Sequence, residues 1–127
     1  MIVTTREETS HTLRAGTEHS RTRSLARRGF FFSETEAVDY LRLAPGSEIG
    51  PRGRSGTEEV WFVLDGDGHL TEDDGTTRPL RRNCLAVCAL NSGTRLKAGA
   101  QGMELVLVAV VPRHLTDSMP TRLPVAS

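Results

Sequence analysis

Residues 58–68 read Glu-Glu-Val-Trp-Phe-Val-Leu-Asp-Gly-Asp-Gly, and this stretch decides the fold. Its first half is rich in β-branched and aromatic residues, which favour an extended strand. Its second half, residues 65–68, alternates Asp with Gly and predicts a turn, because both residues tolerate positive φ. Further short apolar runs follow at intervals of about ten residues, and no helical stripe of useful length occurs. The pattern predicts an all-β sandwich or barrel.

Eight strands are expected, enough for a sheet to close on itself. They cover residues 29–33, 37–43, 60–64, 69–72, 77–80, 84–89, 94–98 and 103–111. Besides the turn at 65–68, Gly, Asp or Asn predicts turns at 45–46, 73–75 and 91–93.

The expected organisation is an N-terminal arm or set of edge strands over 1–28, a barrel over 29–112 and an extended tail over 113–127. The first segment is polar and Arg-rich, so it is either a solvated arm or edge strands that need a cover. We favour the second interpretation, because an arm that crosses to a second subunit removes an exposed edge. We therefore expect a homodimer.

Length and charge narrow the class of protein. The chain has 127 residues, 37% of them hydrophobic and 25% charged, which is typical of one globular domain. Its 16 basic and 16 acidic residues cancel, so no net field attracts nucleic acid or an anionic membrane. The longest mainly apolar run, 105–112, is far shorter than the roughly 20 residues of a membrane helix. We expect a cytoplasmic protein that binds a small molecule, with no nucleic-acid or membrane partner.

Cys84 and Cys88 are the only cysteines. On one strand their sulfurs would share a face but lie roughly 13 Å apart, because each residue advances the chain by about 3.3 Å. That separation is too long for a disulfide or a shared metal ion. We expect both to be buried structural thiols.

Residues 44–66 resemble the first conserved motif of the cupin superfamily, which runs Gly, five residues, His, one residue, His, three or four residues, Glu, six residues, Gly. Gly46, Glu59 and Gly66 match the motif, whereas its two histidine positions are occupied by Arg52 and Arg54.

Residues 80–98 are similar to the second cupin motif, with Thr94 at the position of its third histidine. The resemblance covers roughly residues 37–111. It implies a single-domain, cupin-like double-stranded β-helix, which is a jelly-roll barrel.

The positions at which this sequence differs from the cupin motif are those of the metal-binding histidines. A typical cupin holds a divalent metal ion with three histidines and one glutamate inside the barrel. Arg52 and Arg54 cannot replace histidines, because a guanidinium offers donors but no lone pair and repels a cation. Thr94 is at best a weak oxygen ligand. We expect no metal at the usual position and no other cofactor; a metal site built from unexpected residues is the remaining alternative.

A barrel without metal still encloses a concave site for a small molecule. If Arg52 and Arg54 point inward beside Glu59, they form a cluster that binds a carboxylate, enolate or phosphate. Otherwise 50–56 is a flexible polar loop with its arginines in water. Glu59 is either an acid or base, or one half of a structural salt bridge with an arginine. Glu58 should point to the opposite face, into solvent.

Other residues are assigned to the cavity by strand alternation. Trp61 and Val63 share the parity of Glu59, so they should line the interior, either against a ligand or as core packing. Tyr40 and Arg42 share a parity on the strand before Pro45. If that face is inward they add a phenol and a cation to the cavity, and if it is outward Val38, Leu41 and Leu43 form ordinary core.

Two classes of function follow. The first is a metal-independent cyclase, isomerase or dehydratase of a natural-product pathway, with Glu59 as acid or base. Arg52, Arg54 and Arg42 would hold the developing oxyanion, while Trp61 and Tyr40 shape the cavity. The second is a non-catalytic module that binds a metabolite or a partner protein. The sequence favours the first, without identifying a substrate.

Overall fold

The computed structural model describes residues 3–6, 11–12, 20–30, 35–50, 57–88 and 93–120. The strands within these ranges are β1 (His11–Thr12), β2 (Arg21–Arg27), β3 (Thr35–Leu43), β4 (Glu48–Ile49), β5 (Glu58–Thr71), β6 (Thr77–Arg81), β7 (Leu85–Cys88) and β8 (Arg95–Val110). A 3-10 helix, η1 (Arg28–Phe30), and a short helix, α1 (Arg113–Thr116), complete the described elements. All strand pairs are antiparallel, which confirms the predicted all-β class.

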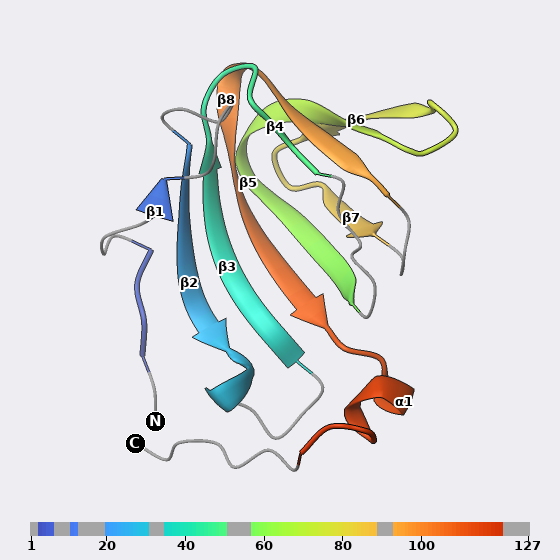
Figure 1. Cartoon of the computed structure of the whole chain (residues 1–127). Coiled ribbons are helices and arrows are strands. Elements are labelled where there is room, and N and C mark those ends of the chain that lie inside the picture. The colour runs from blue at the N-terminus through green and yellow to red at the C-terminus, as the bar shows by residue number, and fades with distance from the viewer. Residues whose placement is uncertain are drawn as a thin grey trace.

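Two long, bent strands, β5 and β8, join the two layers of the fold (Figure 1). The first half of β5 pairs with β7 and with the second half of β8, which in turn pairs with β3. The second half of β5 pairs with β6 and with the first half of β8, which also pairs with β4. The eight described strands form one continuous sheet, and each long strand takes part in both of its layers, which is how a jelly roll encloses its interior.

The bend in β5 corrects the prediction for residues 65–68. They form no turn but continue the strand, and the pairing with β8 shifts between Val63 and Asp65 and again between Gly66 and Gly68. Gly66 has a φ of 78°, and a Cβ there would overlap the carbonyl oxygen of Gly102 on β8. Asp-Gly pairs suit a β-bulge as well as a hairpin turn, and bulges bend the strand. The predicted strands 94–98 and 103–111 likewise join into β8.

Two other turns are confirmed. Gly46 has a φ of 72°, and the Ser47 amide donates to the Ala44 carbonyl at 3.1 Å. Between β5 and β6, Gly75 has a φ of 86° and its amide donates to the Glu72 carbonyl at 2.9 Å. Of the turn expected at 91–93, only Gly93 is described.

The two ends of the chain depart from expectation in part. β2 pairs along β3, and β1 pairs with β2, so the described part of 1–28 contains edge strands of this chain's own sheet. Residues 29–30 of the strand expected at 29–33 belong instead to η1, and residues 31–33 lie outside the described ranges. The tail, expected to be extended, starts with the helical turn α1. Among the described helices, none has the length and apolar character of a membrane span.

The core lies between the two layers of strands. Its large members come from both layers: Leu41, Leu43, Trp61, Val63, Leu70, Leu80, Leu96, Met103, Leu105 and Leu107. Cys88 is buried and belongs to this cluster, as expected, whereas Cys84 is only partly buried and packs against it. Neither cysteine forms a disulfide.

We predict that Gly66→Ala lowers the free energy of unfolding more than Gly75→Ala. Both substitutions place a side chain at positive φ, which costs about 1–2 kcal/mol. Only the Cβ at position 66 also meets backbone, because Gly75 has open space around it. That contact should cost a further ~1–3 kcal/mol. Urea denaturation of the two variants measures the difference, and equal losses would show that β8 does not approach Gly66 closely.

Candidate functional site

The start of β5 places a glutamate inside the barrel. Glu59, Trp61 and Val63 are 3%, 0% and 1% exposed, whereas the intervening Glu58 and Phe62 are exposed on the other face. The predicted alternation is therefore confirmed. The indole Nε1–H of Trp61 donates to Oε2 of Glu59 at 2.9 Å. A buried carboxylate needs such a donor, because it has lost its hydration.

The immediate neighbours of Glu59 on the inner face are small. Its Cα partners are Ala109 on β8 and Cys88 on β7, and the corresponding partners of Trp61 are Leu107 and Ala86. Cross-strand partners point to the same face of a sheet. The carboxylate is thus set in a largely apolar wall with an indole beside it.

A second interior carboxylate, Asp39 on β3, was not singled out in the sequence analysis. It pairs with Leu107 and shares the inner face with Leu41 and Leu43. Its side chain is 16% exposed, and Nη1 of Arg27 on β2 lies 3.2 Å from its Oδ1. Its parity matches that of Leu41 and Leu43, but the sequence left open which face of this strand is inner, so alternation alone could not place Asp39.

The register relates the two carboxylates. Asp39, Leu107 and Trp61 are successive partners across β3, β8 and β5, so the Cα atoms of Asp39 and Trp61 lie roughly 10 Å apart. Glu59 is the next inward-facing residue along β5. The site therefore combines one carboxylate held by an indole N–H with another held by a guanidinium.

Thr94 is buried and lines a hollow of about 590 Å³ between β6 and β7. Cys88, the β7 partner of Glu59, lines the same hollow. Thr94 is thus placed near the β7 side of the interior. The predicted catalytic pair Arg52 and Arg54 lies outside the described residues, so its inward orientation stays a prediction.

Tyr40 and Arg42 do not lie with Glu59, which corrects the expectation that they line its cavity. Their Cα partners on β8 are Val106 and Glu104, on the face opposite the core, and Leu41 and Leu43 take the inward positions. Val38, expected to pack with these leucines, has the parity of Tyr40 and pairs with Val108 on the outer face. Arg42 instead lines a separate hollow of about 850 Å³ at the bend of β5 and β8.

Tyr40 is covered from outside by the N-terminal segment. The guanidinium carbon of Arg6 lies 5.5 Å from the centre of its ring. Burial raises the pKa of Tyr40, and the carboxylate of Glu104, which accepts a hydrogen bond from the phenol, raises it further; Arg6 and Arg42 act in the opposite direction. These groups form a polar cluster on the outer face of β3 and β8.

The fit of a metal ion can be tested on the donor set. Among the described residues, no three His, Cys, Asp or Glu side chains gather into a group that could hold a metal ion. At the described motif positions the donors are the Glu59 carboxylate, already hydrogen-bonded to Trp61, and the Thr94 hydroxyl. This donor set does not fit an ion that takes three imidazoles and a carboxylate. We therefore assign no chemical step to a metal ion.

The architecture is shared with solved structures. A cupin 2 conserved barrel domain protein from Salinispora arenicola has a TM-score of 0.71 at 16% identity, covering 93% of this chain and 93% of that chain. The polyketide cyclase RemF from Streptomyces resistomycificus has a TM-score of 0.70 at 17% identity, covering 87% of this chain and 79% of that chain. A predicted oxalate decarboxylase from Thermotoga maritima has a TM-score of 0.69 at 18% identity, covering 88% of this chain and 100% of that chain.

No model of a protein family matches the sequence, and no curated protein matches it. At identities below one fifth, the structural likeness establishes the fold alone. The chain has the fold of the cupin superfamily, a double-stranded β-helix, as its sequence motifs predicted.

We predict an energetic coupling between Glu59 and Trp61. In a double-mutant cycle of Glu59→Met and Trp61→Phe, the two losses of unfolding free energy should be non-additive by about 1.5–3 kcal/mol, as for hydrogen bonds to charged groups. The matched cycle of Glu58→Met with Trp61→Phe should be additive, because Glu58 lies on the opposite face. Additivity in both cycles would remove the proposed role of the indole N–H.

We predict that Tyr40, the only tyrosine, ionises above its usual pKa of 10.0 in the folded chain. Its contribution to stability is then complete below pH 10.0 and is lost as the pH rises through the folded-state pKa. Absorbance titration at alkaline pH measures the value, with the urea-unfolded chain as reference. Glu104→Gln should lower the pKa and Arg6→Gln should raise it. Equal titration of folded and unfolded chains would contradict the described burial.

Proposed function

We propose that the chain is a metal-independent small-molecule enzyme of the cupin type, in which Glu59 transfers a proton inside the barrel. The observation that carries this proposal is the Glu59 carboxylate, 3% exposed, oriented by the Trp61 indole at 2.9 Å. A carboxylate that a neighbouring donor orients in an apolar wall is positioned to exchange a proton with a bound molecule. The indole is then a positioning group and not a stacking platform for the ligand.

The proposed step is removal of a proton from a carbon next to a carbonyl group. The C–H bond breaks, its electron pair forms the enolate, and the proton goes to Glu59. Arg27, and Arg52 and Arg54 if they face inward, would stabilise the negative oxygen. Where a carbon–carbon double bond extends the enolate, return of the Glu59 proton to the far carbon gives an isomer. Attack of the enolate carbon on a second carbonyl closes a ring, and the new alkoxide takes the proton from Glu59. Departure of a β-hydroxyl group together with the Glu59 proton releases water and leaves a carbon–carbon double bond.

Asp39 supplies the second acid–base group in this proposal. Its ion pair with Arg27 at 3.2 Å orients the carboxylate on the inner face. A carboxylate paired with a guanidinium suits acceptance of a proton, so the proton returned to the product comes from Glu59, which received it. A carbonyl-rich substrate agrees with the presence of a polyketide cyclase among proteins of this fold.

A binding module without catalysis is the alternative function. It is favoured by the replacement of all three motif histidines, by Arg52, Arg54 and Thr94. Loss of metal ligands leaves a container that can hold a metabolite without transforming it. Turnover decides between the two functions.

Glu59→Gln and Glu58→Gln form the matched pair of variants for this test. A panel of aliphatic and aromatic ketones and 1,3-diketones is screened by fluorescence quenching of Trp61, the only tryptophan. For each compound that binds, exchange of carbon-bound hydrogen with deuterium is followed by NMR. Glu59→Gln should lower the exchange rate by about 10²–10⁴-fold with little loss of binding, and Glu58→Gln should leave both unchanged.

Equal exchange rates in the two variants would reject Glu59 as the proton-transfer group. Binding by the wild-type chain without exchange in any compound would support the binding module instead.

A further inference from the structure

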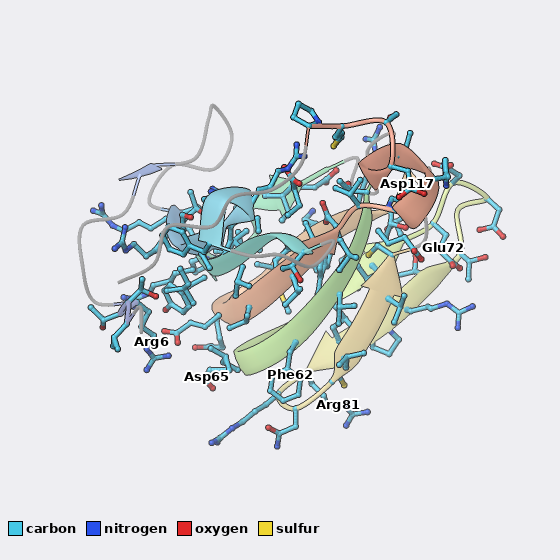
Figure 2. The ribbon with its side chains drawn as sticks, turned by 90° about the horizontal axis from the view of Figure 1, so that it is seen from below. Arg6, Phe62, Asp65, Glu72, Arg81 and Asp117 are labelled. Carbon is cyan, nitrogen blue, oxygen red and sulfur yellow. The ribbon has the colours of Figure 1, made fainter. Side chains whose placement is uncertain are left out.

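The hollow of about 850 Å³ at the bend of β5 and β8 opens on the outer side of the sheet. Its walls come from the end of β3 and the turn that follows it, from the two bends, and from the end of β6 with the turn after it. Figure 2 shows two of its lining residues, Asp65 and Arg81, on the same side of the molecule, away from Asp117. The volume falls within the range of small-molecule sites. Glu59 faces the interior, so this hollow is separate from the proposed site of proton transfer.

The charged residues that line the hollow balance one another. They are three arginines and three carboxylates: Arg42, Arg81, Arg82, Asp65, Asp67 and Glu104. Glu104 is already engaged, because Nη1 of Arg6 lies 3.4 Å from its Oε2 and Nε of Arg42 lies 3.9 Å from its Oε1.

The other four charged residues of the hollow are two acids, Asp65 and Asp67, and two bases, Arg81 and Arg82. Within the part of the chain that the structure describes, none of the four has an ion pair. Carboxylates are acceptors only and guanidinium groups are donors only. The hollow therefore offers both kinds of group to a ligand.

Two of these four residues stand side by side. Asp67 and Arg81 are Cα partners across β5 and β6, so their side chains leave the same face of the sheet roughly 5 Å apart. They do not form an ion pair, because the Asp67 carboxylate lies over Gly99 of β8, on the side of β5 away from β6. A Cβ at Gly99 would overlap Oδ1 of Asp67. An acid and a base are thus held next to each other without neutralising each other.

We propose that this hollow binds an α-amino acid in its zwitterionic form. The carboxylate of the ligand accepts hydrogen bonds from the guanidinium groups of Arg81 and Arg82. Its ammonium group donates hydrogen bonds to the carboxylates of Asp65 and Asp67.

Charge balance is the reason to choose a zwitterion over a simple ion. An anion near the arginines would be repelled by Asp65 and Asp67, and a cation near the carboxylates would be repelled by Arg81 and Arg82. In an α-amino acid both charged groups are attached to one carbon atom, so they can meet an adjacent acid and base at the same time.

The remaining wall of the hollow indicates the side chain of the ligand. Ala44, Pro45 and Met103 line its β3–β8 side. An apolar side chain of the ligand would be partly removed from water against them. We therefore expect an amino acid with an apolar side chain, such as leucine.

The first test compares L-leucine with analogues that each lack one charge. Binding is followed by NMR through the backbone amides of Gly66 and Gly102 at about pH 6.5, below the pKa of about 8 of an α-amino group. L-leucine should bind with a dissociation constant of about 1 mM or lower. N-acetyl-L-leucine, without the ammonium group, and L-leucinamide, without the carboxylate, should each bind about tenfold or more weakly. L-leucyl-L-leucine should also bind more weakly, because its charges lie farther apart.

The second test removes the two side chains that stand side by side. Asp67→Asn and Arg81→Gln keep the approximate shapes of the side chains, and each should weaken the binding of L-leucine about tenfold or more. Asp117→Asn and Arg95→Gln are the matched controls, because both residues are exposed outside the hollow, and they should leave binding unchanged. The amide spectrum of each variant, away from the substitution, checks that it is folded.

Three results would overturn the proposal. One is the absence of saturable binding of L-leucine up to about 10 mM, which is ten times the expected dissociation constant. The second is binding of an analogue with one charge, or of the dipeptide, as tightly as L-leucine. The third is binding that Asp67→Asn and Arg81→Gln weaken no more than their controls do.

Discussion

A hydrogen bond between the Trp61 indole and the buried Glu59 carboxylate is the interaction on which the site depends. Removing a carboxylate from water is costly unless donors replace its hydration. Both residues lie on β5 at adjacent inward positions, so the pairing is fixed by the strand itself. The rest of the barrel excludes water from this pair and decides which other groups face it. Any chemistry inside the barrel starts from that arrangement.

The bends of β5 and β8 create the space around this pair. Each strand crosses from one layer to the other where glycines allow close backbone contact, at Gly66 on β5 and Gly102 on β8. Before the bend β5 carries Glu59 and Trp61, and after it β5 carries Leu70 into the opposite layer. Asp39 faces the same interior from β3, and the largely exposed guanidinium of Arg27 on β2 lies 3.2 Å from its carboxylate. The fold thereby brings groups that are distant in sequence onto one inner surface.

Strand alternation predicted the inward and outward residues of β5 correctly, from Glu58 to Val63, because the cupin motif assigned Glu59 to the interior and the other residues followed by parity. It could not settle β3, where Tyr40, Leu41 and Leu43 are all buried and only the pairing with β8 shows which face is inner. The turn predicted at residues 65–68 was wrong for a related reason. A left-handed glycine serves a hairpin turn and a β-bulge equally, and a distant contact with β8 decides between them. Asp39 was missed because its parity was left open.

We propose that Glu59, held by an indole, transfers a proton without a metal ion. Elemental analysis of the purified chain, after incubation with Zn²⁺, Fe²⁺, Mn²⁺ and Ni²⁺ and removal of excess ion, measures whether the chain binds a metal. No stoichiometric metal is expected in the wild-type chain. One equivalent of a metal ion per chain, lost in Glu59→Gln but kept in Glu58→Gln, would contradict it.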